Sequence, residues 1–262
     1  MKSIYARQIK KVEKQEQKLL NKKENQERRE KIEPIQAKIA EKIPPKLMGV
    51  LEEAFFKGFQ LVFEKGSPWI ERSFNKGKIQ LEYDVNNYAA DKLGTRKQLR
   101  KMDHRANRSR RLNTGLAVIE GAGLGLLGLG LPDIPLFTAM LLKTVYEIAV
   151  SYGFDYEKQD ERIYVLALIN GAIAKGGKQK VLDGRLEEIT ARLENDVPLA
   201  ENLKEKMKET STNLAEAMLL GKYIQGLPLV GIYGGLLNYN LMTRVSRYAK
   251  LKYKKRYLRK KI

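Results

Sequence analysis

Residues 134–152 read IPLFTAMLLKTVYEIAVSY, and residues 163–174 read IYVLALINGAIA. The first stretch follows Pro132-Asp133 and is followed by Gly153, a residue that suits the C-terminal cap of a helix. The second stretch is apolar around the whole helical circumference, which predicts a buried helix. No stretch of the chain alternates apolar and polar residues for long enough to predict a strand. We therefore predict an all-α chain folded as a multi-helix bundle.

Amphipathic helices are predicted on both sides of this apolar centre. In each of them, apolar residues recur at intervals of three and four positions, as one face of a helix requires. Proline and glycine mark several boundaries, among them Pro44-Pro45 and Gly66-Ser67-Pro68. The amphipathic helices predicted in this way span residues 32–43, 47–62, 78–93, 179–194 and 199–220. A basic helix, opened by Gly94-Thr95, is predicted at residues 95–112.

Two apolar segments are rich in glycine, at residues 115–131 and 224–242. Such glycines let helices approach closely, either in a tight bundle or within lipid. Residues 121–142 are long enough to span a membrane, but Pro132 and Pro135 interrupt them. A hairpin in the protein core is the preferred interpretation, and a hairpin that enters the membrane interface is the alternative.

The composition excludes several classes of protein. The chain has 262 residues, with 50 Lys and Arg against 31 Asp and Glu, which gives a net charge of +19. It has no cysteine, which excludes disulfide scaffolds, zinc fingers, iron–sulfur sites and thiol nucleophiles. Its single histidine, His104, lies in a basic run and is expected to be an exposed helical residue. We expect no catalytic residue, no cofactor and no metal site, and therefore a non-enzymatic protein.

The N-terminal residues 1–31 are basic and carry only a thin apolar stripe, which predicts a solvated helix. They contain no apolar run of the kind found in a secretory signal, so we expect a cytoplasmic protein. The chain is predicted to have three regions: a basic N-terminal helical extension (1–44), one helical domain (45–257) and a basic C-terminal tail (258–262).

Clusters of Lys and Arg adjoin both apolar segments. Residues 96–111 precede the first, and residues 244–262, after the second, hold ten basic residues and no acid. Polybasic stretches beside apolar helices are typical of a cytoplasmic membrane surface, where Tyr248, Tyr253 and Tyr257 would suit the headgroup region. The residues predicted to bind an anionic surface are Arg96, Lys97, Arg100, Lys101, Arg105, Arg108, Arg110, Arg111, Arg247, Lys250, Lys252, Lys254, Lys255 and Arg256.

Nucleic acid is the alternative partner. Basic helices with interleaved tyrosines also bind phosphate backbones without sequence specificity. The basic runs here adjoin apolar segments, and they do not form a polar recognition helix with side chains placed for base contacts. We therefore predict a peripheral protein at the inner face of the cell membrane, with non-specific nucleic-acid binding as the alternative.

Three stretches together resemble the EcsC protein family of bacteria: FFKGFQLVFEKGS (55–67), GLGLLGLGLPDIPLFTAMLLKTVYEIAVSYGFD (123–155) and GLPLVGIYGGLLNYN (226–240). The middle stretch is the most specific, and the likeness extends over roughly residues 45–257. The resemblance implies a helical fold and a cytoplasmic, membrane-linked setting with an ABC transporter as partner. It implies no particular biochemical activity.

The positions that carry the family pattern are expected to be structural. Asp133 stands where the N-cap of a helix belongs, and Pro135 follows in the first turn, where its missing N–H does no harm. The family-like positions are Gly128, Pro132, Asp133, Pro135, Ala149, Tyr152, Gly153 and Asp155.

Overall fold

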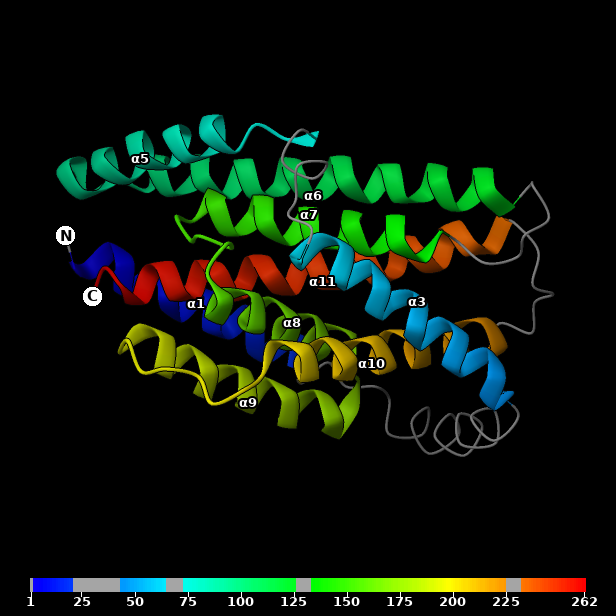
Figure 1. Cartoon of the computed structure of the whole chain (residues 1–262). Helices are drawn as coiled ribbons and strands as arrows, with labels where there is room; N and C mark the ends of the chain where they lie inside the picture. Colours follow the sequence, from blue (N-terminus) through cyan, green and yellow to red (C-terminus); the bar gives the residue numbers. More distant parts are fainter. Residues whose placement is uncertain (1, 21–42, 65–72, 126–132, 225–231) are drawn as a thin grey trace.

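The computed structural model describes residues 2–20, 43–64, 73–125, 133–224 and 232–262. Within these ranges every regular element is an α-helix, and most of the helices run roughly along one direction (Figure 1). The predicted all-α multi-helix bundle is confirmed. The helices are α1 (Lys2–Leu20), α3 (Pro45–Phe63), α5 (Lys76–Leu93), α6 (Arg96–Gly125), α7 (Ile134–Ser151), α8 (Gln159–Ile173), α9 (Gly176–Glu194), α10 (Leu203–Ile224) and α11 (Ile232–Arg259).

Most of the predicted helices lie where the sequence pattern places them. The helices predicted at 47–62, 78–93 and 179–194 correspond to α3, α5 and α9. Helix α10 begins at Leu203, later than the pattern indicates. The helix predicted at 32–43 falls, but for its last residue, outside the described residues.

Helices α6 and α11 each join a basic run and a glycine-rich apolar segment. Helix α6 has 30 residues and contains the whole basic run and the first part of the apolar segment. Helix α11 has 28 residues and leads from the second apolar segment into the basic tail. The rest of the two segments, 126–131 and 225–231, lies outside the described residues. The two long helices pack along each other, so the bundle places their basic halves side by side.

Helices α7 and α8 form the centre of the bundle. Fifteen of the 18 residues of α7 and 12 of the 15 residues of α8 are buried, so the predicted buried helix at 163–174 is confirmed. Among the described helices, α7 alone has the length and apolar composition of a membrane span, and 83% of it is buried inside the protein. Packing on α3, α5, α6 and α11 accounts for that apolar composition.

The ends of α7 are fixed by two of the family-like positions. Asp133 Oδ1 accepts a hydrogen bond from the Leu136 N–H at 3.0 Å, with Pro135 in the first turn, so the predicted N-cap is confirmed. Gly153 has a φ of 78°, and a Cβ built there would lie 2.1 Å from the Tyr83 ring. No residue with a side chain fits this position in the observed packing.

Two other family-like positions also make local structural contacts. The Tyr152 hydroxyl donates to Asp103 Oδ1 at 2.8 Å, which ties the end of α7 to α6. Asp155 Oδ1 accepts from the Glu157 N–H at 3.2 Å in the turn before α8. Gly128 and Pro132 lie outside the described residues.

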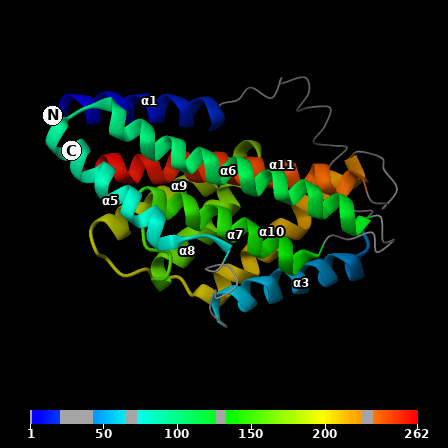
Figure 2. The ribbon, with the colours of Figure 1, turned by 90° about the horizontal axis from the view of Figure 1, so that it is seen from above.

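The N-terminal helix is part of the bundle. Helix α1 packs along α11, and its Tyr5 and Val12 are 5% and 1% exposed (Figure 2). The Tyr5 hydroxyl donates to Asp91 Oδ1 of α5 at 3.1 Å. The prediction that this helix is solvated is therefore wrong. A thin apolar stripe suffices because α11 also presents lysines that pair with Glu16 of α1.

Candidate functional site

Helix α11 carries basic residues on two sides that differ in their surroundings. The side that meets the carboxylates of α1, α8 and α9 is called the paired side. The side that faces α6 across an open groove is called the groove side. Arg256 shows the character of the paired side, because both guanidinium Nη atoms contact Glu161 of α8, at 2.7 and 3.0 Å. The same guanidinium lies 4.2 Å from the ring centroids of Phe154 and Tyr164.

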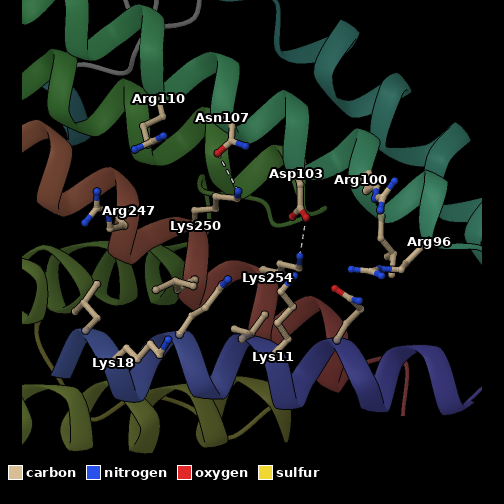
Figure 3. Close-up of a pocket in the computed structure, with 16 residues that line it drawn as sticks. Lys11, Lys18, Arg96, Arg100, Asp103, Asn107, Arg110, Arg247, Lys250 and Lys254 are labelled. Atoms are coloured by element: carbon tan, nitrogen blue, oxygen red, sulfur yellow. Dashed lines mark hydrogen bonds and ion pairs between the residues drawn. The ribbon is translucent and has the colours of Figure 1, made fainter. Parts of the chain in front are cut away.

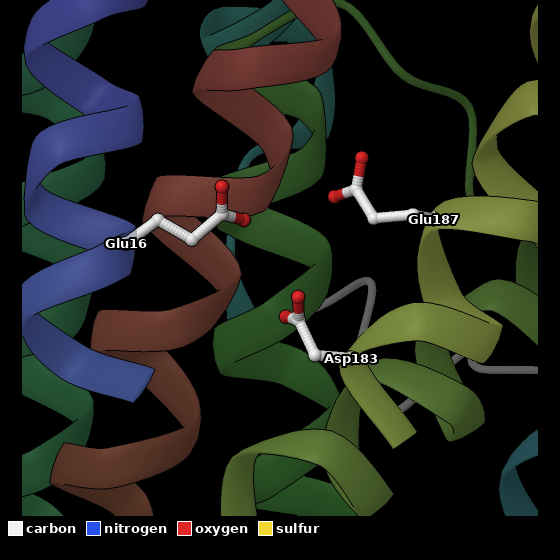
Figure 4. A group of neighbouring side chains, drawn as sticks. All are labelled: Glu16, Asp183 and Glu187. Carbon is white, nitrogen blue, oxygen red and sulfur yellow. The ribbon is translucent and has the colours of Figure 1, made fainter. Parts of the chain in front are cut away.

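Lys252 lies in a cage of three carboxylates on the paired side. Its Nζ is 2.5 Å from Glu16 Oε1, 2.6 Å from Asp183 Oδ1 and 2.8 Å from Glu187 Oε1. Figure 4 shows these three acids converging from α1 and α9. One carboxylate oxygen of each lies within 4.8 Å of the others, a spacing that could also hold a metal ion. Here the ammonium group of the chain itself supplies the positive charge between them. We therefore assign the cluster a structural role.

A second lysine and an arginine complete this network. Lys255 Nζ is 2.6 Å from Glu16 Oε2 and 3.2 Å from Glu187 Oε1, and Arg259 Nη2 is 2.8 Å from Glu187 Oε2. Burial alone would raise the pKa of Glu187, but Lys252, Lys255 and Arg259 outweigh it and lower that pKa to about 2. Glu187 is thus held ionised by the cations around it.

Three predicted surface cations are therefore inside the protein. Lys252, Lys255 and Arg256 are 1%, 7% and 4% exposed. The prediction that they bind an anionic surface is wrong, because carboxylates of other helices already neutralise them. A buried charge is retained only where such partners are present.

The tyrosines of the tail are also buried, and the prediction that they lie in a lipid headgroup region is wrong. The Tyr253 hydroxyl donates to Glu161 Oε1 at 2.9 Å, and the Tyr248 hydroxyl donates to Asp183. The Tyr257 hydroxyl donates to an amide oxygen of α5 at 3.0 Å. Their rings fill the core along α11 while their hydroxyls satisfy polar groups of neighbouring helices.

A groove of roughly 700 Å³ lies on the groove side, with α1 and α6 as its walls and α11 between them (Figure 3). Its lining includes Gln8 and Gln15 from α1 and Asn107 from α6. Asp103 is the one acid among the described residues that line it. The basic residues that line it are Lys11, Lys18, Arg96, Arg100, Arg110, Arg247, Lys250 and Lys254.

Two lysines in the middle of the groove already have partners on α6. Lys254 Nζ lies 2.6 Å from Asp103 Oδ2, and Lys250 Nζ donates to Asn107 Oδ1 at 2.8 Å (Figure 3). Because Asp103 also accepts from the Tyr152 hydroxyl, its carboxylate is held in place from two directions. These contacts join α6 and α11 along the floor of the groove.

Like charges crowd the rest of the groove. Burial lowers the pKa of the Arg110 guanidinium, and the charge of Arg247 lowers it further. Burial also lowers the pKa of Lys250; Asp103 opposes this change, whereas Lys254 and Arg110 add to it. An anion in the groove would relieve this repulsion, so the arrangement suits a negatively charged ligand.

The structure sorts the remaining predicted cations by their place on α6 and α11. Arg105 lies 3.7 Å from Glu82 of α5, so it is part of a contact between helices. Exposed positions on α6 outside the groove lining are Lys97, Lys101, Arg108 and Arg111. Positions that the structure brings together in the groove are Arg96, Arg100, Arg110, Arg247, Lys250 and Lys254.

Sequence reasoning missed the wall supplied by α1. Lys11, Gln15 and Lys18 recur at intervals of four and three, so they share one face of that helix. This spacing could have predicted a second basic surface, but only if α1 had been recognised as part of the bundle. His104 is exposed on α6 and is not part of the groove lining.

Comparison with known proteins places the chain in a family. The profile of the EcsC protein family matches residues 6–258. The chain is 26% identical over 219 residues to Protein EcsC of Bacillus subtilis (strain 168), and the aligned region covers 82% of this chain and 81% of that protein. It is 25% identical over 159 residues to Uncharacterized protein YdbA of the same organism, and the aligned region covers 59% of this chain and 57% of that protein. No solved structure matches.

The family match extends further than the expected range of 45–257. It begins inside α1, at residue 6, so the expectation that the basic N-terminal residues lie outside the likeness is wrong. Packing of α1 on α11 gives the physical reason, because this helix supplies part of the core and one wall of the groove. This chain belongs to the EcsC protein family.

Proposed function

We propose that this protein is a non-enzymatic, cytoplasmic protein that associates peripherally with the anionic inner face of the cell membrane. The observation that carries the proposal is the gathering of cations on α6 and in the adjoining groove, where one acid stands among eight basic residues. A Lys or Arg near an anionic lipid surface contributes about 1 kcal/mol. Several such residues on one face would hold the protein at a membrane at low salt.

The exposed side of α6 supports the proposal. Lys97, Lys101, Arg108 and Arg111 are all exposed. With His104 between them, they recur at intervals of three and four residues and so form one continuous stripe along the helix. The stripe lies beside the groove, so both sets of cations can approach the same flat anionic surface.

An apolar row on α5 favours lipid over nucleic acid. Leu81, Val85 and Tyr88 are 64%, 59% and 66% exposed and follow one another at intervals of four and three. Exposed Lys78 and Lys92 stand at the two ends of the row, with Lys92 Nζ 5.7 Å from the centroid of the Tyr88 ring. Helix α5, which carries this row, packs beside α6, which carries the basic stripe (Figure 2). Apolar side chains framed by lysines suit the membrane interface.

The chemistry of the groove supports the non-enzymatic part of the proposal. Its lining offers cations and amides, and its carboxylate is held by Lys254 and Tyr152. We expect His104→Ala to leave cellular function intact. Loss of function at unchanged abundance would contradict this part.

An ABC transporter is the protein partner that the EcsC resemblance suggests. Because the wild-type chain has no cysteine, a single Lys101→Cys variant would carry one site for crosslinking on the exposed side of α6. Crosslinking to a transporter subunit in cells is the expected result. Crosslinks to many unrelated membrane proteins, with no enrichment of a transporter subunit, would contradict this partner.

Vesicle co-sedimentation tests membrane binding directly. The purified protein is expected to sediment with vesicles that contain phosphatidylglycerol and much less with neutral vesicles. Binding should weaken as salt rises, because the Debye length falls from about 10 Å at 0.1 M to about 3 Å at 1 M. Equal binding to neutral vesicles would contradict the electrostatic mechanism. Binding to DNA or RNA without vesicle binding would replace the proposal by nucleic-acid binding.

Matched variants locate the binding face. The triple variant Lys97→Gln, Lys101→Gln, Arg108→Gln should lower the affinity for anionic vesicles on the order of a hundredfold at low salt. The control, with the same loss of charge, replaces exposed lysines of α9 and α10, on the far side of the bundle from α6 (Figure 1). The control variant is Lys180→Gln, Lys204→Gln, Lys208→Gln. Equal losses in both would show that net charge, and not this face, determines binding.

A further inference from the structure

The cations of the groove fall into a middle and two ends. In the middle, lysines of α11 already contact an acid and an amide of α6. At each end lies a pair of arginines, and each pair is called a pole. The Arg110 pole consists of Arg110 and Arg247, and the Arg100 pole consists of Arg96 and Arg100, while Lys11 and Lys18 lie on the α1 wall (Figure 3).

The two poles are separated by much of the length of the groove. Arg100 and Arg110 are ten positions apart on one helix, which corresponds to about 15 Å along its axis. Among the described residues, no carboxylate forms an ion pair with Arg96, Arg100 or Arg247. A single small anion would reach one pole and leave the other unchanged.

The residue types at the poles indicate the ligand. An arginine guanidinium presents paired donors that match the oxygens of a phosphate group and hydrogen-bond it in a fixed geometry. Each pole holds two arginines, and Lys11 and Lys18 of α1 line the facing wall. We infer that the groove is a binding site for an extended molecule that carries several phosphate groups, with one phosphate at each pole.

Other features of the groove agree with this ligand. Gln15 of α1 lies between Lys11 and Lys18 in the groove lining and can donate to phosphate oxygens along the chain of the ligand. Burial and neighbouring cations lower the pKa of Arg110 and of Lys250, so a polyanion would remove a repulsion that is present in the unliganded protein.

This inference goes beyond membrane association. The exposed stripe of α6 can bind lipid whether or not the groove has a ligand, and the groove can bind polyphosphate in solution. The phosphates could belong to a lipid headgroup or to a soluble molecule. The two sources share the same chemistry at the poles.

Calorimetric titration of the full chain with linear inorganic polyphosphate and with inorganic monophosphate tests the inference. Polyphosphate should bind at least about a hundredfold more tightly, because it engages both poles. Replacing one pole, by Arg110→Gln with Arg247→Gln or by Arg96→Gln with Arg100→Gln, should cost about tenfold or more in affinity for polyphosphate. Conversion of the same pairs to lysine should cost less affinity, because the charge is kept. Some loss should remain, because lysine lacks the paired donors of arginine.

The control removes two charges from the same helix outside the groove. Lys97→Gln with Lys101→Gln should change the affinity for polyphosphate by less than about threefold. The inference is overturned if this control loses as much affinity as the pole variants, or if monophosphate binds as tightly as polyphosphate. Tighter binding of an oligonucleotide than of polyphosphate with equally many phosphates would also overturn it, in favour of nucleic acid. Circular dichroism and thermal unfolding of each variant verify that it is folded.

A competition experiment distinguishes the two sources of phosphate. If polyphosphate displaces the protein from phosphatidylglycerol vesicles, and the pole variants no longer bind them, the groove takes lipid headgroups. If vesicle binding persists in the pole variants but is lost in the Lys97→Gln, Lys101→Gln, Arg108→Gln variant, the groove ligand is soluble. The second result would support both the groove site and the membrane proposal, on separate surfaces.

Discussion

The paired side and the groove side of α11 use the same residue types in opposite surroundings. On the paired side, Lys252 and Arg256 lie 2.5–3.0 Å from carboxylate oxygens of α1, α8 and α9. On the groove side, Arg247 and Lys250 face further cations of α1 and α6. Lys250 and Lys252 are two positions apart, yet one belongs to a solvent-accessible groove and the other is 1% exposed.

The difference shows where the surplus charge of the protein is placed. A buried cation without an acid partner would cost several kcal/mol, so acids accompany the cations that the fold buries. A cation in an open groove keeps much of its hydration and can remain beside others of the same sign. The paired side therefore holds the bundle together, and the groove side retains positive charge for a ligand.

The largest expected effect separates two lysines of the same helix. Lys252→Met should destabilise the protein by about 3–5 kcal/mol, because it leaves the buried carboxylates of Glu16 and Asp183 and the half-buried carboxylate of Glu187 without their central cation. Urea denaturation followed by circular dichroism measures the change. The control is Lys250→Met, which removes a crowded groove cation and its hydrogen bond to Asn107, and it should lower stability by no more than about 1 kcal/mol. Similar losses of stability in both variants would contradict the difference between the two sides.

Acid unfolding should report the paired side. The folded-state pKa of Glu187 is about 2, below its ordinary value of 4.5, so its contribution to stability is present above pH 4.5 and is lost as the pH falls towards 2. We expect wild type to be more stable than Glu187→Gln by on the order of 1–2 kcal/mol at pH 6. That difference should shrink between pH 4.5 and pH 2. A difference that is constant over this range would show that the ionised carboxylate is not what stabilises this side.

The smallest expected effect comes from placing an acid on the groove side. Arg247→Glu puts a carboxylate near Arg110 and should raise stability by up to about 1 kcal/mol at low salt, with the gain disappearing at high salt. The same variant should lose binding to polyphosphate. Urea denaturation at two salt concentrations measures the first effect. A loss of stability at low salt would mean that Arg247 has a structural role like that of Lys252.

Several features follow from the sequence because they depend on nearby residues. The apolar runs of α7 and α8 predict buried helices, and both are buried. The N-cap at Asp133 involves a hydrogen bond to a residue only three positions away, so the local pattern suffices to predict it. The EcsC resemblance rests on the same short-range pattern and is confirmed by the family match.

The partners of the tail could not be read from the sequence in the same way. Lys255 pairs with Glu16, which is 239 positions away, and Arg256 pairs with Glu161, which is 95 positions away. Nothing in the local spacing separates these cations from Arg247 or Lys250. The role of α1 was missed for the same reason, because its thin apolar stripe is complemented by charges of α11.

The sequence by itself determined the helical class, the central helices, the caps of α7 and the excess of positive charge. These properties follow from composition, from periodicity and from contacts within a turn or two of the chain. Only the tertiary structure decided which cations are neutralised and which line the groove. The physical reason is that the free energy of a charged side chain depends on its burial and on the charges around it, and helices from distant parts of the chain set both.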